Sequence, residues 1–296
     1  MKISDFEIKT TKIKVGKISK RIYYRGNFDK KIFKKSIALV GSRKMTRYGK
    51  EVVDKFVSGF VANGITTISG FMYGVDTEVH QKTVDYGGCT VAVFGCGLDV
   101  IYPPENEKLY SQILENNGLV ISEYEPSAKP HLWKFPQRNK IVARLASLGV
   151  LVIEAGEKSG ALITAGLARK MGKKVHVVPG PINSKISVGC NNLIKSGKAI
   201  MVTEPGDILG KSVQRISKAW PISSVADRGN QTVVNLNGLE SKIYKALEIE
   251  PLDIDEITAK IGGSVVEIGS TLSVMGLKGI ITESEGKYYL NGSNTS

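Results

Sequence analysis

Three short segments of this sequence combine small residues with cations, which suits a ligand that carries phosphate. The first is Gly41-Ser42-Arg43-Lys44, which directly follows an apolar run. A glycine lets the backbone approach an anion, a serine hydroxyl can donate a hydrogen bond, and the arginine fork matches phosphate oxygens. This segment predicts an anion-binding loop, although a turn glycine followed by a surface arginine would have the same sequence.

The second segment, Lys134–Lys140, reads KFPQRNK and mixes one aromatic ring with three cations and two amides. Cations bind phosphate, whereas an unpaired base needs a flat face to stack on, worth about 1–3 kcal/mol per base. The mixture favours single-stranded nucleic acid, and the predicted contacts are Phe135, Gln137, Arg138, Asn139 and Lys140. The alternative interpretation places Phe135 in the core and leaves Arg138 and Lys140 as solvated helix residues.

The third segment, Glu154–Thr164, reads EAGEKSGALIT and marks a strand end, a glycine-bearing loop and a helix start. Ser159 and Gly160 at the helix entry would offer unpaired backbone N–H groups to an anion, or Ser159 is an ordinary N-terminal cap. Two further loops, Ser69–Asp76 and Gly95–Pro103, also follow apolar runs. Five such loops on one edge would outline a long rim, which suits a polymer better than a small cofactor.

The segments between these loops predict the fold that must position them. From residue 36 onward, short apolar runs alternate with stretches of helical period, which is typical of βαβ units. Strands are predicted at Ile37–Val40, Ile65–Ser69, Thr90–Phe94, Leu119–Ser122, Val150–Glu154 and Val175–Val178. Helices are predicted between them, among others over residues 75–86, 104–116, 137–147, 161–171 and 189–196. The fold class is therefore α/β, with a Rossmann-like, doubly wound and mostly parallel sheet over residues 36–210. Because ligands bind beyond the carboxyl ends of the strands in such sheets, the loops should meet at one edge.

The rest of the chain is predicted to form three smaller parts. Residues 1–35 are a basic lead segment with too few apolar positions for a core of their own, and the polar residues 211–234 form a linker. Residues 235–296 show three short helical patterns and a β-hairpin, which predicts a small winged-helix domain. Because residues 236–296 carry 5 Lys and Arg against 9 Asp and Glu, this domain is expected to be structural or to contact protein rather than DNA.

The positive charge of the chain is concentrated at its beginning. The formal net charge is +13, and residues 1–50 hold 16 Lys and Arg against 3 Asp and Glu, so the remaining residues balance at 25 of each sign. Such a basic segment either keeps a protein soluble or binds a polyanion. The basic run continues into the Gly41–Lys44 loop and reaches Arg47, which favours a polyanion.

Several classes of protein are excluded by what the sequence lacks. It has no apolar stretch of about 18 residues or more and no secretory signal, so a cytoplasmic protein is expected. Its three cysteines and three histidines show neither disulfide nor metal-ligand spacing, so no metal or other cofactor is predicted. Nucleophile-elbow, phosphate-loop and dinucleotide motifs are missing, so no catalytic residue is assigned and the protein is not expected to be an enzyme.

Taken in order, the motifs of residues 36–209 resemble the DNA-processing protein A family, also called Smf. They are VGSR, SGFMYGVD, FGCGLDVIYPPEN, SEY, KFPQRNKIVARL, VIEAGEKSGALITAGLARKMGKKVHVVPG and NNLIKSG. The resemblance implies an extended Rossmann fold that binds single-stranded DNA, forms homodimers and loads RecA recombinase onto that DNA during natural transformation. It also implies a groove, without an established catalytic site, that is lined by Arg43, Phe135, Arg138, Asn139, Lys140, Ser159 and Gly160.

The chain departs from the family pattern at two places, and other readings compete with it. Only the short stretch IYYRGNFDKK resembles the end of the helical N-terminal domain of longer members, and Met72 and Tyr73 stand where members usually carry small residues. Nucleotide phosphoribohydrolases of the lysine-decarboxylase-like group share a G-S-R turn, but they would carry a P-G-G-x-G-T loop where this chain reads EAGEKSGALITA. A transcriptional regulator that acts through the winged helix would prefer duplex DNA. The acidic second domain argues against this interpretation, because its charge would repel DNA.

Overall fold

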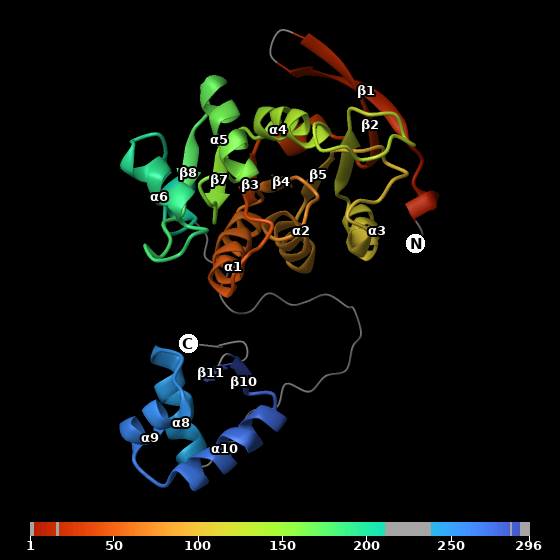
Figure 1. Ribbon diagram of the computed structural model, residues 1–296. Coiled ribbons are helices and arrows are strands. Elements are labelled where there is room, and N and C mark those ends of the chain that lie inside the picture. The colour runs from red at the N-terminus through yellow and green to blue at the C-terminus, as the bar shows by residue number, and fades with distance from the viewer. Residues whose placement is uncertain (1–2, 16–17, 211–237, 285, 291–296) are drawn as a thin grey trace. The chain divides into compact units, whose positions relative to one another are not determined.

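The computed structural model describes residues 3–15, 18–210, 238–284 and 286–290 (Figure 1). The chain divides into two compact units, Met1–Pro221 and Ile222–Ser296, each with a hydrophobic core of its own. The linker predicted over residues 211–234 lies outside the described residues.

The first unit is built on a nine-stranded sheet with the strand order β1-β2-β6-β5-β4-β3-β7-β8-β9. The strands are β1 (Lys9–Val15), β2 (Ile18–Gly26), β3 (Ser36–Gly41), β4 (Thr66–Ser69), β5 (Thr90–Phe94), β6 (Leu119–Ser122), β7 (Val150–Ile153), β8 (Val175–Val177) and β9 (Ile200–Met201). Strands β3 to β9 pair with one another in parallel, whereas β2 pairs antiparallel with both β1 and β6. The predicted Rossmann-like, mostly parallel sheet is confirmed.

Helices cover both faces of this sheet. They are α1 (Arg47–Ala62), α2 (Val75–Asp85), α3 (Glu107–Glu115), α4 (Lys134–Leu145), α5 (Gly160–Lys170), α6 (Val188–Lys195) and α7 (Gly206–Leu209). Side chains of a strand point alternately to opposite faces, so Ile37 and Leu39 of β3 pack with α1 and α2, whereas Ala38 and Val40 pack with α4 and α5. Figure 1 shows α1, α2 and α3 on one side of the strands and α4 and α5 on the other.

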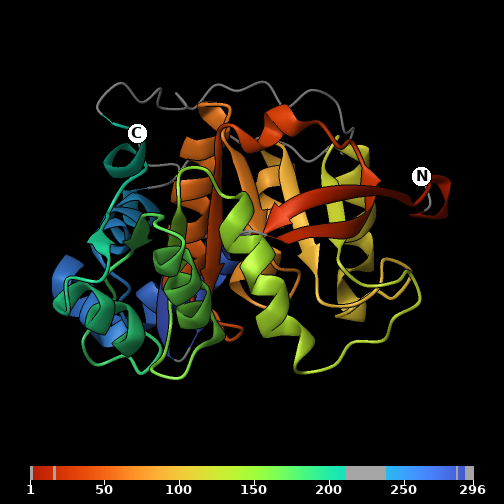
Figure 2. The ribbon, with the colours of Figure 1, turned by 90° about the horizontal axis from the view of Figure 1, so that it is seen from above.

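The first 35 residues, predicted to be a lead segment outside the α/β domain, instead widen its sheet. Strands β1 and β2 form a hairpin whose second strand pairs with β6, and Figure 2 shows this hairpin reaching α4. Ile22 is fully buried in the core, with Ile13 and Tyr24 packed beside it. Ile13 stands between two lysines and the run Ile22–Tyr24 between two arginines, so the charge of the segment obscures its strand period. Lysines on such an edge also discourage pairing with another chain.

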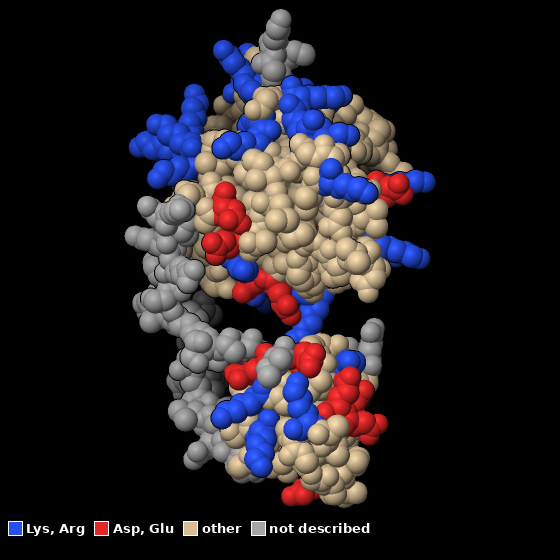
Figure 3. All heavy atoms as spheres, turned by 90° about the vertical axis from the view of Figure 1, so that its left-hand side faces the viewer, with Lys and Arg blue, Asp and Glu red and all other residues tan. Residues whose placement is uncertain are grey.

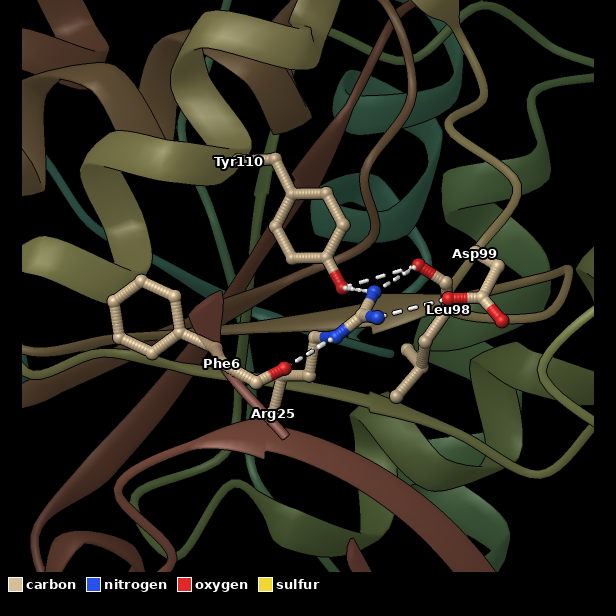
Figure 4. Close-up of polar contacts among 5 residues, drawn as sticks. All are labelled: Phe6, Arg25, Leu98, Asp99 and Tyr110. Atoms are coloured by element: carbon tan, nitrogen blue, oxygen red, sulfur yellow. Dashed lines mark hydrogen bonds and ion pairs between the residues drawn. The ribbon is translucent and has the colours of Figure 1, made fainter. Parts of the chain in front are cut away.

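Arg25 fastens the hairpin to the parallel part of the sheet (Figure 4). Its side chain, 9% exposed, donates hydrogen bonds to the carbonyl oxygens of Phe6 at 2.9 Å and Leu98 at 2.8 Å. The same guanidinium forms an ion pair with Asp99 at 2.8 Å and lies 3.4 Å from the Tyr110 hydroxyl. One cation thus joins β2 to the residues before β1 and to the loop after β5.

We expect Arg25→Met to lower the free energy of unfolding by about 2 kcal/mol, because hydrogen bonds to a charged group contribute about 1.5–3 kcal/mol. Asp99 is half exposed and would stay solvated. For a domain of this size the melting temperature should fall by roughly 4–8 °C. The matched control is Arg21→Met, at an exposed position on the same strand, which should change stability by less than about 0.5 kcal/mol. Equal melting temperatures for both variants would show that Arg25 does not anchor the hairpin.

The second unit consists of three helices and a two-stranded hairpin, namely α8 (Gly238–Ile249), α9 (Ile254–Ile261), α10 (Val265–Leu277), β10 (Ile281–Ser284) and β11 (Lys287–Leu290). Its core includes Ile243, Ile257, Ile268, Leu272 and Leu290. Helix α10 contains no Lys or Arg. These are the elements that the winged-helix prediction requires, and the assignment itself stays a prediction.

Candidate nucleic-acid interface

A pocket lies where the strand order of the sheet reverses. Strands β3 and β7 are neighbours, and the chain continues from them toward opposite sides of the sheet, which is where doubly wound α/β proteins bind ligands. The pocket has a volume of about 560 Å³ and is lined from the loops after β3, β4 and β7 and from α4 and α5. These loops therefore meet at one edge as predicted, whereas the Gly95–Pro103 loop does not contribute to the lining.

Nine of the eleven predicted contact residues line this pocket: Gly41, Ser42, Arg43, Lys44, Phe135, Arg138, Asn139, Ser159 and Gly160. The other two, Gln137 and Lys140, are exposed on α4 and do not line it. Helix α4 begins at Lys134 rather than at the predicted residue 137, so the whole segment follows helical geometry. Because successive residues are about 100° apart, Lys140 lies about 200° around the helix from Arg138. The structure thus separates Lys140 from Arg43.

Gly41 and Ser42 support the loop itself. A Cβ on Gly41 would lie 1.9 Å from the carbonyl oxygen of Ile153 and 2.5 Å from Val75 Cγ2, so only glycine allows this packing against β7 and α2. The Ser42 hydroxyl accepts a hydrogen bond from the Lys44 N–H and donates one to the Lys44 carbonyl, both at 3.0 Å. These contacts within the protein support the loop, and the roles predicted for the two residues, close approach to an anion and donation to it, stay predictions.

Arg43 is exposed, and the ring of Phe135 supports it. The guanidinium carbon lies 5.7 Å from the centroid of that ring, a cation–π arrangement. Phe135 is only 7% exposed, because its ring packs on Gly95 and lies 5.8 Å from the ring of Tyr102. The core interpretation therefore applies to most of Phe135, which positions Arg43 at the pocket.

A charge pair, the partly buried Asp76 and the buried Arg138, contributes to the lining. Arg138 donates a hydrogen bond to the carbonyl of Val93, and Asp76 accepts one from the Ser69 hydroxyl at 3.0 Å. Burial raises the pKa of Asp76 and the Arg138 charge opposes this rise, while burial lowers the pKa of Arg138. A Cβ on Gly70 would lie 2.1 Å from Asp76 Oδ2 and 2.6 Å from both terminal nitrogens of Arg138, so this position must stay without a side chain.

Glu154 holds the beginning of α1 beside the pocket loop. Its carboxylate accepts hydrogen bonds from the N–H of Thr46, at 2.9 Å, and from the Thr46 hydroxyl, and Thr46 caps α1. Glu154 is 5% exposed and has a φ of 50°, a conformation uncommon for a residue other than glycine. It therefore fixes the loop that carries Arg43. Neither Asp76 nor Glu154 was assigned a role from the sequence, because a single carboxylate at a helix start or strand end is common.

The beginning of α5 forms another wall of the pocket. The Ser159 hydroxyl accepts a hydrogen bond from the Ala161 N–H at 3.3 Å, as its interpretation as an N-terminal cap predicts. Apart from its chain neighbours and the backbone of its own helix, no atom lies within 4 Å of the place of a Cβ on Gly160, so this turn is open. Lys158, which is exposed, also lines the pocket and adds a cation that was not among the predicted contacts.

His80 supports the Gly70 loop from within the protein. It is fully buried, with Nε2 2.6 Å from the carbonyl oxygen of Gly70 and Nδ1 2.7 Å from the Thr90 hydroxyl. A carbonyl oxygen can only accept, so Nε2 carries the proton of a neutral ring. Burial lowers the pKa of His80 to about 4.

We expect the free energy of unfolding to decrease as the pH falls from 6.5 to about 4. In this interval His80 binds a proton in the unfolded chain but not in the folded one. The contribution of His80 to stability is therefore fully present above pH 6.5 and is lost as the pH falls toward 4. Across the whole interval the free energy of unfolding should decrease by about 3 kcal/mol. Urea denaturation across this range should show a flatter pH dependence for His80→Gln than for the control His131→Gln, which replaces an exposed histidine. Parallel curves would show that His80 is not the titrating group.

Lysine and arginine side chains also gather away from the pocket. Figure 3 shows them over the upper part of the first unit, where Figure 1 places the β1–β2 hairpin and α5. Lys12, Lys14 and Arg21 are exposed on the hairpin, and Arg144 Nε donates a hydrogen bond to the Lys14 carbonyl at 3.3 Å. The excess charge of the first 50 residues is therefore shared between the pocket loop and the hairpin.

Within the part of the chain that the structure describes, no group of three or more metal-ligating side chains occurs. None of the helices in that part has the length and apolar character needed to cross a membrane. Cys89, Cys96 and Cys190 are free thiols.

Two relatives resemble this chain in sequence over much of its length. It is 42% identical over 190 residues to DNA processing protein DprA of Streptococcus pneumoniae, which covers 64% of this chain and 66% of that protein. It is 31% identical over 298 residues to protein Smf of Synechocystis, which covers 90% of this chain and 74% of that protein. The chain thus spans just under two thirds of the pneumococcal protein.

The fold has a solved counterpart as well. DNA processing protein A from Helicobacter pylori, described for its unique single-stranded DNA binding mode, superimposes with a TM-score of 0.61 at 30% identity and covers 70% of this chain and 95% of that chain. The sequence model of the DNA recombination-mediator protein A family matches residues 8–212, which include the whole sheet and the pocket. The chain therefore belongs to the DNA recombination-mediator protein A family.

Proposed function

We propose that the pocket between β3 and β7 binds single-stranded DNA, with Arg43, Lys44 and Lys158 contacting its phosphates. These three residues are exposed cations of the pocket lining. The one carboxylate of the lining, Asp76, lies beside the buried Arg138. A phosphate that enters therefore meets an excess of positive charge, which is the observation that carries the proposal.

The size of the pocket favours an unpaired strand over a duplex. A volume of about 560 Å³ falls within the range of sites that enclose small ligands, about 300–1,000 Å³. Such a pocket admits one unpaired nucleotide and excludes the full width of a double helix. Tyr73, 41% exposed at its rim, adds an aromatic surface for a base.

The kinship with the Helicobacter protein and the pneumococcal protein supports a wider proposal. The chain would protect single-stranded DNA and load RecA recombinase onto it in recombination or natural transformation, as a cytoplasmic homodimer that catalyses no reaction itself. The second unit would contact protein or serve the structure, because α10 offers no cation to DNA.

A binding titration tests the central claim. Fluorescence anisotropy of labelled oligo-dT and of a duplex of equal length, each at two salt concentrations, should give tighter binding of the single strand. The logarithm of its affinity should fall with the logarithm of salt concentration by about 0.7 for each phosphate contacted. Equal affinity for both DNAs would refute the preference for an unpaired strand.

The competing reading as a nucleotide phosphoribohydrolase makes a separate prediction. It requires release of a free base from nucleoside monophosphates, which chromatography after incubation with the protein would detect. We expect no release, because the chain reads EAGEKSGALITA where these enzymes would carry the P-G-G-x-G-T loop. Turnover would overturn the non-enzymatic assignment.

A further inference from the structure

An exposed aromatic cluster stands at the beginning of α4, next to the pocket lining. Trp133 directly precedes the helix and is 57% exposed. The ring of His131 is nearly parallel to it, at 12° with centroids 6.3 Å apart, and the ring of Tyr124 meets it edge-on at 86° and 6.2 Å. We call Tyr124, His131 and Trp133 the ledge. The exposed surface of the Trp133 indole does not contribute to the packing of this unit.

The ledge is held in place from one side by a buried cation. Lys134 is 7% exposed, and its ammonium lies 4.7 Å from the centroid of the Tyr124 ring and 5.7 Å from that of Trp133. The same ammonium donates a hydrogen bond to the Lys129 carbonyl at 2.7 Å, and the Lys134 N–H donates one to the His131 carbonyl at 2.9 Å. The rings are therefore fixed before any ligand arrives, which reduces the entropy lost on binding.

The ledge adjoins the proposed DNA site. Phe135 lines the pocket, and only Lys134 lies between it and Trp133 in the chain, so their Cα atoms are about 7 Å apart at most. Tyr124 follows β6, which is parallel to β5 in the sheet, so the ledge lies at the same carboxyl edge as the loops of the pocket. A strand that leaves the pocket along this edge passes the ledge.

We infer that the ledge is a stacking platform for an unpaired base of the strand whose phosphates the pocket holds, an inference that rests on the proposed function. Aromatic faces in water bind cations or flat rings. Because the Lys134 ammonium already occupies the cation–π position of this cluster, it repels a second cation. A nucleobase remains, and the same positive charge attracts the phosphates on either side of it.

The two tryptophans of the sequence, Trp133 and Trp220, allow a direct optical test. In Trp220→Phe protein, all tryptophan emission comes from Trp133. Titration with oligo-dT should quench this emission, whereas an abasic oligonucleotide of equal length, which keeps the phosphates and lacks the bases, should bind more weakly and leave the emission largely unchanged.

Substitution at the ledge supplies the second readout. Trp133→Ala should weaken oligo-dT binding by roughly tenfold, the equivalent of one stacked base, and should leave binding of the abasic strand unchanged. Trp133→Phe should restore part of the loss. Leu132→Ala, at an exposed apolar neighbour, is the control and should bind both strands like the parent protein.

The outcomes separate the two proposals. If oligo-dT binds through Arg43 but neither quenches Trp133 nor responds to Trp133→Ala, the ledge is not a stacking platform and the pocket assignment stands. If the abasic strand loses as much affinity as oligo-dT in Trp133→Ala, the residue acts on phosphate binding and the inference is also overturned. If no single strand binds, both proposals fall together.

Discussion

Arg43→Ala is expected to weaken oligo-dT binding by roughly tenfold to a hundredfold. A hydrogen bond that involves a charged group contributes about 1.5–3 kcal/mol, and a tenfold change in affinity corresponds to about 1.4 kcal/mol. Arg43 is exposed at the pocket and held by the Phe135 ring, so little freedom is lost when it meets a phosphate. The salt dependence should flatten by about 0.7 in slope. The oligo-dT affinity of Arg43→Lys should lie between those of the parent protein and Arg43→Ala. An ammonium keeps the positive charge but lacks the two-pronged hydrogen bonding of the guanidinium.

Two controls separate a specific contact from a general loss of charge. Arg47 lies four residues further along, outside the pocket lining, and is paired with Glu51 at 3.0 Å, so Arg47→Ala removes the same charge at a nearby place. Lys140→Ala removes an exposed cation from the other side of α4. Both variants should bind nearly as tightly as the parent protein. If Arg43→Ala behaves like them, the pocket is not where DNA binds.

Arg138→Met should reduce the free energy of unfolding by about 3 kcal/mol, because it removes a buried charge whose electrostatic interaction stabilises the Asp76 carboxylate. Arg138 is 3% exposed and donates to the Val93 carbonyl, so that carbonyl also loses its donor. Burial already raises the pKa of Asp76 and Arg138 opposes this, so the variant should raise that pKa further. Thermal denaturation at neutral pH should show a melting temperature lower by roughly 6–12 °C.

A double-mutant cycle tests whether Asp76 is the reason. Asp76→Asn combined with Arg138→Met should be more stable than the sum of the single changes implies, by about 0.5–3 kcal/mol. Arg169→Met, at an exposed position on α5, is the matched control and should melt close to the parent protein. Strict additivity of the two single changes would show that Asp76 and Arg138 do not interact.

The strands could be predicted because their signal is local. The bounds of β5 and β6 match the predicted Thr90–Phe94 and Leu119–Ser122, since each is an apolar run closed by glycine or polar residues. The parallel topology then brings the loops of Arg43 and Ser159 to one edge. For Lys140 the alternative interpretation, a solvated helix residue, agrees with the structure, because Lys140 is exposed and does not line the pocket, whereas Arg138 is buried. The sequence left both interpretations open because the face of α4 that meets the pocket depends on tertiary packing.

The sequence by itself therefore determined the α/β architecture, the edge at which ligands bind and the presence of Arg43 there. Only the tertiary structure decided which side chains surround that arginine. Glu154 reaches Thr46 across 108 residues of sequence, and Gly41 is a glycine because β7 and α2 press against it. The physical reason is that the backbone conformation of a segment depends mainly on its own residues. The partners of a side chain depend instead on how segments far apart in the chain pack together.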